Sequence, residues 1–149
     1  MNLFHFKNFS VMLDYAHNTH GLQALGKMIS NVDSPRKVGL IAGVGDRRDE
    51  DLISLGEESA RIFDEIIIRQ DKNLRGRTEQ EIIDLMTKGI YNIKPDMSII
   101  SFRKESEAID HAMQNAIKDS FIVVISDVVP DALEQVKNYK EKEDGTLTL

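Results

Sequence analysis

Three short polar segments of this sequence combine residue types that bind nucleotides, phosphates or carboxylates. The first covers residues 14–18 (DYAHN) and directly precedes a segment of helical periodicity. The carboxylate of Asp14 could bind hydroxyl groups, while His17 and Asn18 could bind phosphate oxygens beside the free N–H groups of the helix N-terminus. The alternative is structural, because Asp14 and Asn18 are also common helix-capping residues. His20 has no third ligand at a fixed spacing, which disfavours a metal site.

The second segment covers residues 43–51 (GVGDRRDED). Gly43 and Gly45 allow the backbone to approach a ligand, and the neighbouring guanidinium groups of Arg47 and Arg48 can hold phosphate or carboxylate oxygens. The three acidic residues that end the segment suit the positive end of a helix dipole, so a turn followed by a helix start is the alternative. That alternative leaves the two arginines unexplained. The segment lacks the third glycine of a dinucleotide-binding fingerprint.

The third segment covers residues 70–77 (QDKNLRGR) and is too charged to be buried. We consider it either a mobile clamp for an anionic substrate or a solvated connection. Ser126 and Asp127 provide a weaker signal further along the chain. The sequence contains no G-x-x-x-x-G-K-[ST] phosphate loop and no visible nucleophile–base arrangement, so the machinery of ATP hydrolysis is missing.

These segments follow short apolar runs that alternate with helical periodicity, which predicts βα units on a mostly parallel sheet. Thr78 and Glu81 have the spacing of a capping box at the start of one helix, and Pro130 suits the first turn of a last helix that ends near Tyr139. The predicted strands are Val11–Tyr15, Val38–Gly43, Glu65–Arg69, Ser98–Phe102 and Phe121–Ser126. The apolar stripes of the four helices between them are Leu22, Leu25, Met28, Ile29 and Val32; Leu52, Leu55, Ser59, Ile62 and Phe63; Ile82, Leu85, Met86 and Ile90; and Ile109, Ala112, Met113, Ala116 and Ile117.

Parallel sheets bind ligands beyond the carboxyl ends of their strands. In the predicted arrangement, most of the unusual polar groups follow strands directly. We therefore expect residues 14–18, 43–51, 69–77 and 126–127 to converge on one rim of the sheet.

The composition is that of a single globular domain. The chain has 149 residues, of which 41% are hydrophobic and 30% are charged, and its net charge of -6 disfavours binding to nucleic acid. It has no cysteine, which is consistent with a cytoplasmic location, and no apolar stretch long enough to span a membrane. We expect one domain over residues 1–140 and a disordered tail over residues 141–149.

The string at residues 14–18 resembles the D-Y-A-H-N-P signature that opens the C-terminal domain of the Mur ligases and of folylpolyglutamate synthetases. Together with residues 45–52 (GDRRDEDL) and 75–77 (RGR), it is similar to the ligase half of cyanophycin synthetases. The resemblance extends over residues 1–139. One departure is Thr19, which stands where the family usually has proline.

The resemblance implies a Rossmann-like α/β domain of an ATP-dependent amide ligase. A preceding central domain would supply the phosphate loop and the Mg²⁺ site, a carboxyl substrate would be activated as an acyl phosphate, and an amine would attack it. This domain would close over ATP and help to bind the amino-acid substrate; in cyanophycin synthetases the reaction adds arginine to the β-carboxyl groups of poly-aspartate. The implied nucleotide-binding residues are Asp14, His17, Asn18, Arg47 and Arg48, and the implied substrate-binding residues are Asp46, Asp71, Arg75 and Arg77.

The missing phosphate loop leads us to expect an excised domain or a split subunit whose partner is the central domain. A stand-alone ligand-binding or regulatory module of the same fold, without catalysis, is the alternative. A dinucleotide-dependent oxidoreductase is disfavoured by the failed fingerprint.

Overall fold

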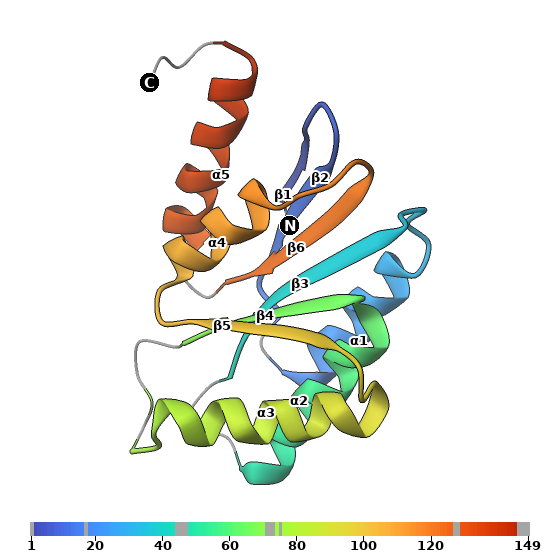
Figure 1. Cartoon of the computed structure of the whole chain (residues 1–149), viewed down its shortest axis with the longest axis vertical. Coiled ribbons are helices and arrows are strands. Elements are labelled where there is room, and N and C mark those ends of the chain that lie inside the picture. Colours follow the sequence, from blue (N-terminus) through green and yellow to red (C-terminus); the bar gives the residue numbers. More distant parts are fainter. Residues whose placement is uncertain are drawn as a thin grey trace.

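The computed structural model describes residues 2–16, 18–43, 48–70, 74, 76–126 and 129–145. They form six strands and five helices (Figure 1). The elements are β1 (Asn2–His5), β2 (Ser10–Asp14), α1 (Thr19–Ile29), β3 (Arg36–Ala42), α2 (Asp49–Ile62), β4 (Glu65–Arg69), α3 (Glu79–Ile93), β5 (Ser98–Phe102), α4 (Glu105–Gln114), β6 (Ser120–Ile125) and α5 (Val129–Glu143).

The strands form one sheet in the order β1-β2-β6-β3-β4-β5. All neighbouring strands are parallel except β1, which pairs with β2 in the antiparallel sense. This confirms the predicted Rossmann-like, mostly parallel sheet, and each of the five predicted strands lies within two residues of an observed one. β1 was not predicted, because four residues carry too little alternation to identify a strand and its pairing with β2 is a tertiary contact.

The helices cover both faces of the sheet. Successive steps from β2 to β5 move in one direction and place α1, α2 and α3 on one face, whereas the return from β5 to β6 places α4 on the opposite face with α5 (Figure 1). Right-handed crossovers produce this division, because reversing the direction of travel reverses the face. Each face buries its own apolar cluster, one around Phe63, Ile82 and Met86 and the other around Leu40, Ile109 and Val124.

The helix boundaries follow the predicted signals in part. The capping box is confirmed, since Thr78 Oγ1 accepts a hydrogen bond from the Glu81 N–H at 3.0 Å and the Glu81 carboxylate accepts one from the Thr78 N–H at 3.4 Å. Ile117 lies beyond the end of α4 and is 55% exposed, so its predicted place in the apolar stripe is wrong. The last helix was predicted to end near Tyr139, but α5 continues to Glu143.

Two glycines allow α2 and α3 to touch through their backbones. A Cβ atom on Gly56 would lie 2.2 Å from the Met86 carbonyl oxygen, and one on Gly89 would lie 2.0 Å from the Ile53 carbonyl oxygen. Since no side chain fits at such distances, the backbones of α2 and α3 are in direct contact at these two positions. Among the described helices, none has the length and apolar content that a bilayer crossing requires.

Candidate functional site

The carboxyl ends of the parallel strands form one rim, and every helix after β2 starts from it. β6 lies between β2 and β3, but the helix that follows β6 packs on the opposite face from the helices that follow its two neighbours. Connections that diverge in this way leave a crevice above the strand between them, which is where open α/β sheets bind ligands. The end of β6 therefore marks the centre of the candidate site.

Asp14 and Asn18 lie at this rim and make local hydrogen bonds. Asp14 Oδ2 accepts a hydrogen bond from the Ala16 N–H at 3.3 Å, and Asn18 Oδ1 accepts one from the Gly21 N–H at 2.7 Å. Asn18 is the N-cap of α1. The capping role considered for Asn18 is thus observed, and the remaining N–H groups of the first turn of α1 point toward the rim.

Arg48 is the N-cap residue of α2, and its side chain is 76% exposed. Asp51 accepts hydrogen bonds from the Arg48 backbone N–H at 3.3 Å and from its guanidinium group at 3.2 Å. The hydrogen bond with Asp51 and the charges of Asp51 and Glu50 raise the pKa of Arg48, so the group stays cationic. Arg48 is thus an exposed cation that the Asp51 carboxylate holds at the start of α2. In this position it can bind an anion at the rim.

Arg77 joins the starts of two neighbouring helices. Its guanidinium group donates to Asp49 Oδ1 on α2 at 2.7 Å and to Glu81 Oε1 on α3 at 2.9 Å. The hydrogen bond with Asp49 is the main cause of a raised pKa for Arg77. Arg77, one of the two arginines that the resemblance implied for substrate binding, is therefore close to α2, whose first residues belong to the second polar segment.

The other residues implied for the site fall outside the described part of the chain. They are His17, Asp46, Arg47, Asp71, Arg75 and, at the weaker signal after β6, Asp127. Of the nine residues implied for binding, the structure therefore places Asp14, Asn18, Arg48 and Arg77.

A buried ionic cluster beneath the rim was not predicted. Arg69, the last residue of β4, is 5% exposed, and its Nε lies 3.0 Å from Oε2 of Glu105, the first residue of α4. The same Glu105 oxygen accepts a hydrogen bond from the Ser126 hydroxyl at 2.8 Å, while the Ser126 N–H donates to the Asp14 carbonyl at 3.0 Å. The cluster thus ties the ends of β2, β4 and β6 to α4. The only signal in the sequence was an arginine that ends an apolar strand.

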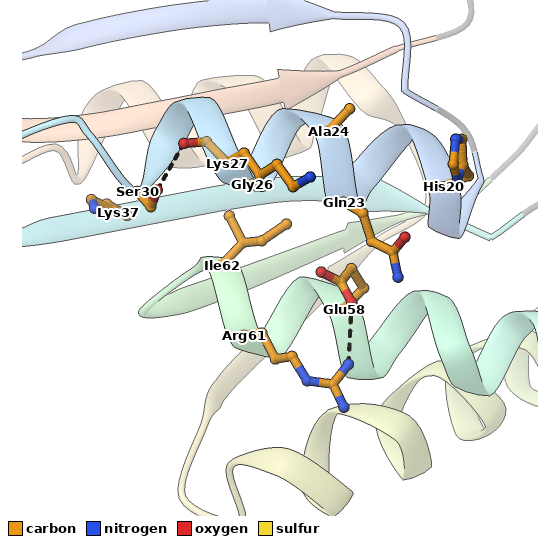
Figure 2. A pocket seen from close by; sticks show the side chains of 10 residues that line it. All are labelled: His20, Gln23, Ala24, Gly26, Lys27, Ser30, Lys37, Glu58, Arg61 and Ile62. Carbon is orange, nitrogen blue, oxygen red and sulfur yellow. Dashed lines mark hydrogen bonds and ion pairs between the residues drawn. The ribbon is translucent and has the colours of Figure 1, made fainter.

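A wide groove of about 760 Å³ between α1 and α2 lies outside this site (Figure 2). Its lining includes Lys27, Lys37 and Arg61, but Figure 2 shows the two lysine side chains pointing apart and Arg61 turned to Glu58, 3.1 Å away. Because these cations do not converge on one point, the groove lacks the geometry of an anion site. His20 lies at one end of it, and the described residues contain no group of three metal-ligating side chains.

The chain was then compared with known proteins. The family model for the glutamate ligase domain of the Mur ligases matches residues 1–128. The cyanophycin synthetase of Geminocystis herdmanii is 41% identical over 139 residues, which cover 93% of this chain and 16% of that protein. The chain therefore spans about one-sixth of the length of this relative.

Solved structures share the fold at low sequence identity. A UDP-N-acetylmuramoyl-L-alanyl-D-glutamate–2,6-diaminopimelate ligase aligns with a TM-score of 0.72 at 18% identity, over 84% of this chain and 25% of that one. E. coli FolC in complex with ADP aligns with a TM-score of 0.68 at 18% identity, over 89% of this chain and 30% of that one. With a family model that covers most of its length and a relative that is 41% identical, the chain belongs to the Mur ligase family as a glutamate ligase domain.

Proposed function

We propose that this domain is the C-terminal part of an ATP-dependent amide ligase and that it closes over ATP and an amino-acid substrate. The observation that carries the proposal is the family match over residues 1–128, which includes all three polar segments of the rim. The proposed reaction joins an activated carboxyl group to an amine. The phosphate loop, absent from this sequence, would come from a central domain.

The arrangement of the rim supports nucleotide binding. The N-termini of α1, α2 and α3 all open on the same edge, and helix N-termini favour anions through their free N–H groups and their dipoles. Asp14, His17, Asn18, Arg47 and Arg48 are the residues that we assign to the nucleotide. When bound, ATP with Mg²⁺ would supply the phosphoryl group that activates the carboxyl substrate, and the residues of this chain would orient it and exclude water.

The third segment is assigned to the amino-acid substrate. Asp46, Asp71, Arg75 and Arg77 are the proposed contacts. Arg77 is held in place by Asp49 and Glu81, and in this proposal the positive charge of its guanidinium group contributes to binding the substrate carboxylate.

The test is the substitution His17→Ala in the complete ligase, with His20→Ala as the matched control. His17 belongs to the assigned nucleotide set and His20 does not, although they are only three residues apart. Loss of one charge-assisted hydrogen bond should lower kcat/KM roughly ten- to hundredfold. His20→Ala changes an exposed side chain, so it should keep kcat/KM within about twofold and shift the melting temperature of the domain by no more than about 2 °C. His17→Ala should also leave the melting temperature within about 2 °C, because the proposal assigns His17 to the ligand and not to the fold.

Two outcomes contradict the proposal. One is a kcat/KM of the His17 variant that stays near the unmodified value. The other is a large drop in melting temperature with residual activity that follows the folded fraction, which would make His17 a structural residue.

A further inference from the structure

An ion pair joins the second and third polar segments of the rim. The Arg77 guanidinium group donates to Asp49 Oδ1 at 2.7 Å, across 28 positions of sequence. Asp49 is the first residue of α2 and directly follows Arg48, which is assigned to the nucleotide. Arg77 is the last residue of the segment that is assigned to the amino-acid substrate. The ion pair therefore connects the two proposed halves of the site.

Burial distinguishes this ion pair from others at helix starts. The Arg77 side chain is 16% exposed, whereas those of Arg48 and Arg103, which also pair with carboxylates in the first turns of helices, are 76% and 83% exposed. An exposed pair restricts a side chain little, because solvent screens the attraction between the charges. A mostly covered guanidinium group that contacts two carboxylates, those of Asp49 and Glu81, is held in one place.

The backbone next to Arg77 is fixed as well. The Arg77 N–H donates to the Leu74 carbonyl at 3.0 Å, and the Leu74 side chain packs against the core cluster around Phe63. Gly76 has a φ of 85°, a left-handed conformation that glycine adopts without strain. The core thus anchors one end of this turn, and Asp49 holds the other end against α2.

From these contacts we infer that Asp49 is a positioning residue for the amino-acid substrate, because it holds Arg77 where the guanidinium charge meets the substrate carboxylate. The inference rests on the proposed function, which assigns Arg77 to that carboxylate. Glu81 does not have the same role, since it belongs to the helix that Arg77 directly precedes and also accepts a hydrogen bond from the Thr78 N–H. The contact with Asp49 instead fixes Arg77 relative to α2 and to Arg48.

The negative charge of Asp49 opposes its positioning effect. A carboxylate beside Arg77 repels the substrate carboxylate, so a purely electrostatic role predicts tighter substrate binding when Asp49 is removed. Asp49 is 64% exposed, and solvent weakens this repulsion. Positioning should therefore dominate. The two roles predict opposite changes in the KM of the amino acid, so the experiment separates them.

The test measures the KM for L-arginine and for ATP in the complete ligase; L-arginine is the amino acid expected from the resemblance to cyanophycin synthetases. Arg77→Ala should raise the KM for arginine about tenfold or more, as for a lost charge-assisted hydrogen bond. Asp49→Ala should raise it about three- to tenfold and keep the KM for ATP within about twofold. The double variant Asp49→Ala/Arg77→Ala should have the KM of Arg77→Ala, because Asp49 acts through Arg77.

Two further variants separate positioning from a structural role. Asp49→Asn keeps an oxygen that accepts from Arg77 but loses the charge, so its KM for arginine should lie closer to the unmodified value than to that of Asp49→Ala. Glu57→Ala is the matched control, because Glu57 lies about two turns further along α2 and accepts a hydrogen bond from Asn92 of α3 at 3.3 Å. This contact joins the same two helices away from the rim, and its loss should keep the KM for arginine within about twofold.

The outcomes distinguish failure of the inference from failure of the proposed function. An unchanged KM for arginine in Arg77→Ala overturns the substrate assignment and this inference with it. If Arg77→Ala raises that KM but Asp49→Ala leaves it unchanged or lowers it, the assignment stands and the positioning role is wrong. A further rise in the double variant, or an equal rise in Glu57→Ala, also overturns the positioning role. Melting temperatures check folding, and Asp49→Ser and Arg77→Gln replace the alanine variants if those fail to fold.

Discussion

At the scale of single residues, we expect the ion pair between the buried Arg69 and the partly buried Glu105 to stabilise the fold. Glu105→Ala removes the carboxylate that faces Arg69 Nε at 3.0 Å and accepts from Ser126. Breaking a buried ion pair by removing one partner typically costs about 3 kcal/mol or more. We expect urea denaturation to report a loss of that size in the free energy of unfolding.

Glu79→Ala is the matched control for this substitution. Glu79 is likewise the first residue of a helix and faces an arginine, but the side chains of Arg103 and Glu79 are 83% and 39% exposed. An exposed pair contributes about 1 kcal/mol or less. If Glu105→Ala and Glu79→Ala lower the free energy of unfolding equally, burial does not make the Arg69 ion pair more stabilising than an exposed one.

Tyr139 provides a prediction of pH dependence. Its hydroxyl group donates to Asp110 Oδ1 at 2.6 Å, and burial together with this hydrogen bond raises its pKa from 10.0 to about 12. The folded chain therefore holds the phenol proton more tightly than the unfolded chain does. The resulting stability is fully present below pH 10 and is lost as the pH rises toward 12.

Melting temperatures near pH 9 and pH 11 test this prediction. The unmodified chain should lose more of its melting temperature over this interval than Tyr139→Phe, which has no phenol proton to release. An identical loss in both proteins would assign the effect to other groups.

The sequence predicted individual residues well where the signal was local. The capping box of Thr78 and Glu81 and the N-cap at Asn18 depend on contacts within four residues, and both are present. Arg69 and Glu105 escaped prediction because their contact joins residues 36 positions apart, from β4 and α4. The roles assigned to His17, Arg47 and Arg75 stay predictions, as do the ligand contacts of the described site residues.

At the scale of elements, the close contact of α2 and α3 has a clear test. Gly89→Ala would put a methyl group 2.0 Å from the Ile53 carbonyl oxygen, where two backbones must separate. Alanine favours a helix by about 1 kcal/mol over glycine, but overpacking costs about 1–3 kcal/mol, and a clash with backbone belongs at the upper end of that range. We expect a net destabilisation of about 2 kcal/mol by urea denaturation.

Gly26→Ala is a suitable comparison. A Cβ atom on Gly26 would lie 2.9 Å from Cγ1 of Ile62, which is a side-chain atom and not a backbone atom. Because a side chain can rotate away, Gly26→Ala should lower the free energy of unfolding by less than half as much as Gly89→Ala does. A larger loss at Gly26 would contradict the view that contact between backbones controls this helix pair.

Element boundaries were predicted less well than element types. The end of α5 was missed because the signals that extend it are not apolar: Lys140 pairs with Glu143 and Asp144, and the Glu143 carboxylate accepts from the distant Lys7 N–H at 3.0 Å. β1 was missed for a related reason, since only its pairing with β2 identifies it. Periodicity detects a stripe within one segment and not a partner elsewhere in the chain.

At the scale of the whole molecule, the alternation of strands and helices predicted a parallel sheet with one functional rim. It did not predict that β6 lies between β2 and β3, because strand order depends on how the two faces pack rather than on local pattern. That order is what places Ser126 and the Arg69 cluster at the centre of the rim.

The chain by itself should not turn over ATP. Its sequence has no phosphate loop to hold the group that is transferred. We expect phosphate release with ATP, Mg²⁺ and amino acids to stay at the level of a no-protein blank. Steady turnover that copurifies with the chain through two independent separations would contradict the proposed division of the site between domains.

The antiparallel direction of β1 determines how the molecule should be mounted for surface measurements. Asn2 lies opposite Leu13, one residue before Asp14, so the first described residue is at the rim. Helix α5 runs away from the rim to Glu143. The Glu143 carboxylate accepts a hydrogen bond from the Lys7 N–H, which lies before β2 at the end of the sheet opposite the rim. A sensor chip or bead coupled after α5 would leave the rim facing the solution, whereas one coupled through the first residues would hold it against the support.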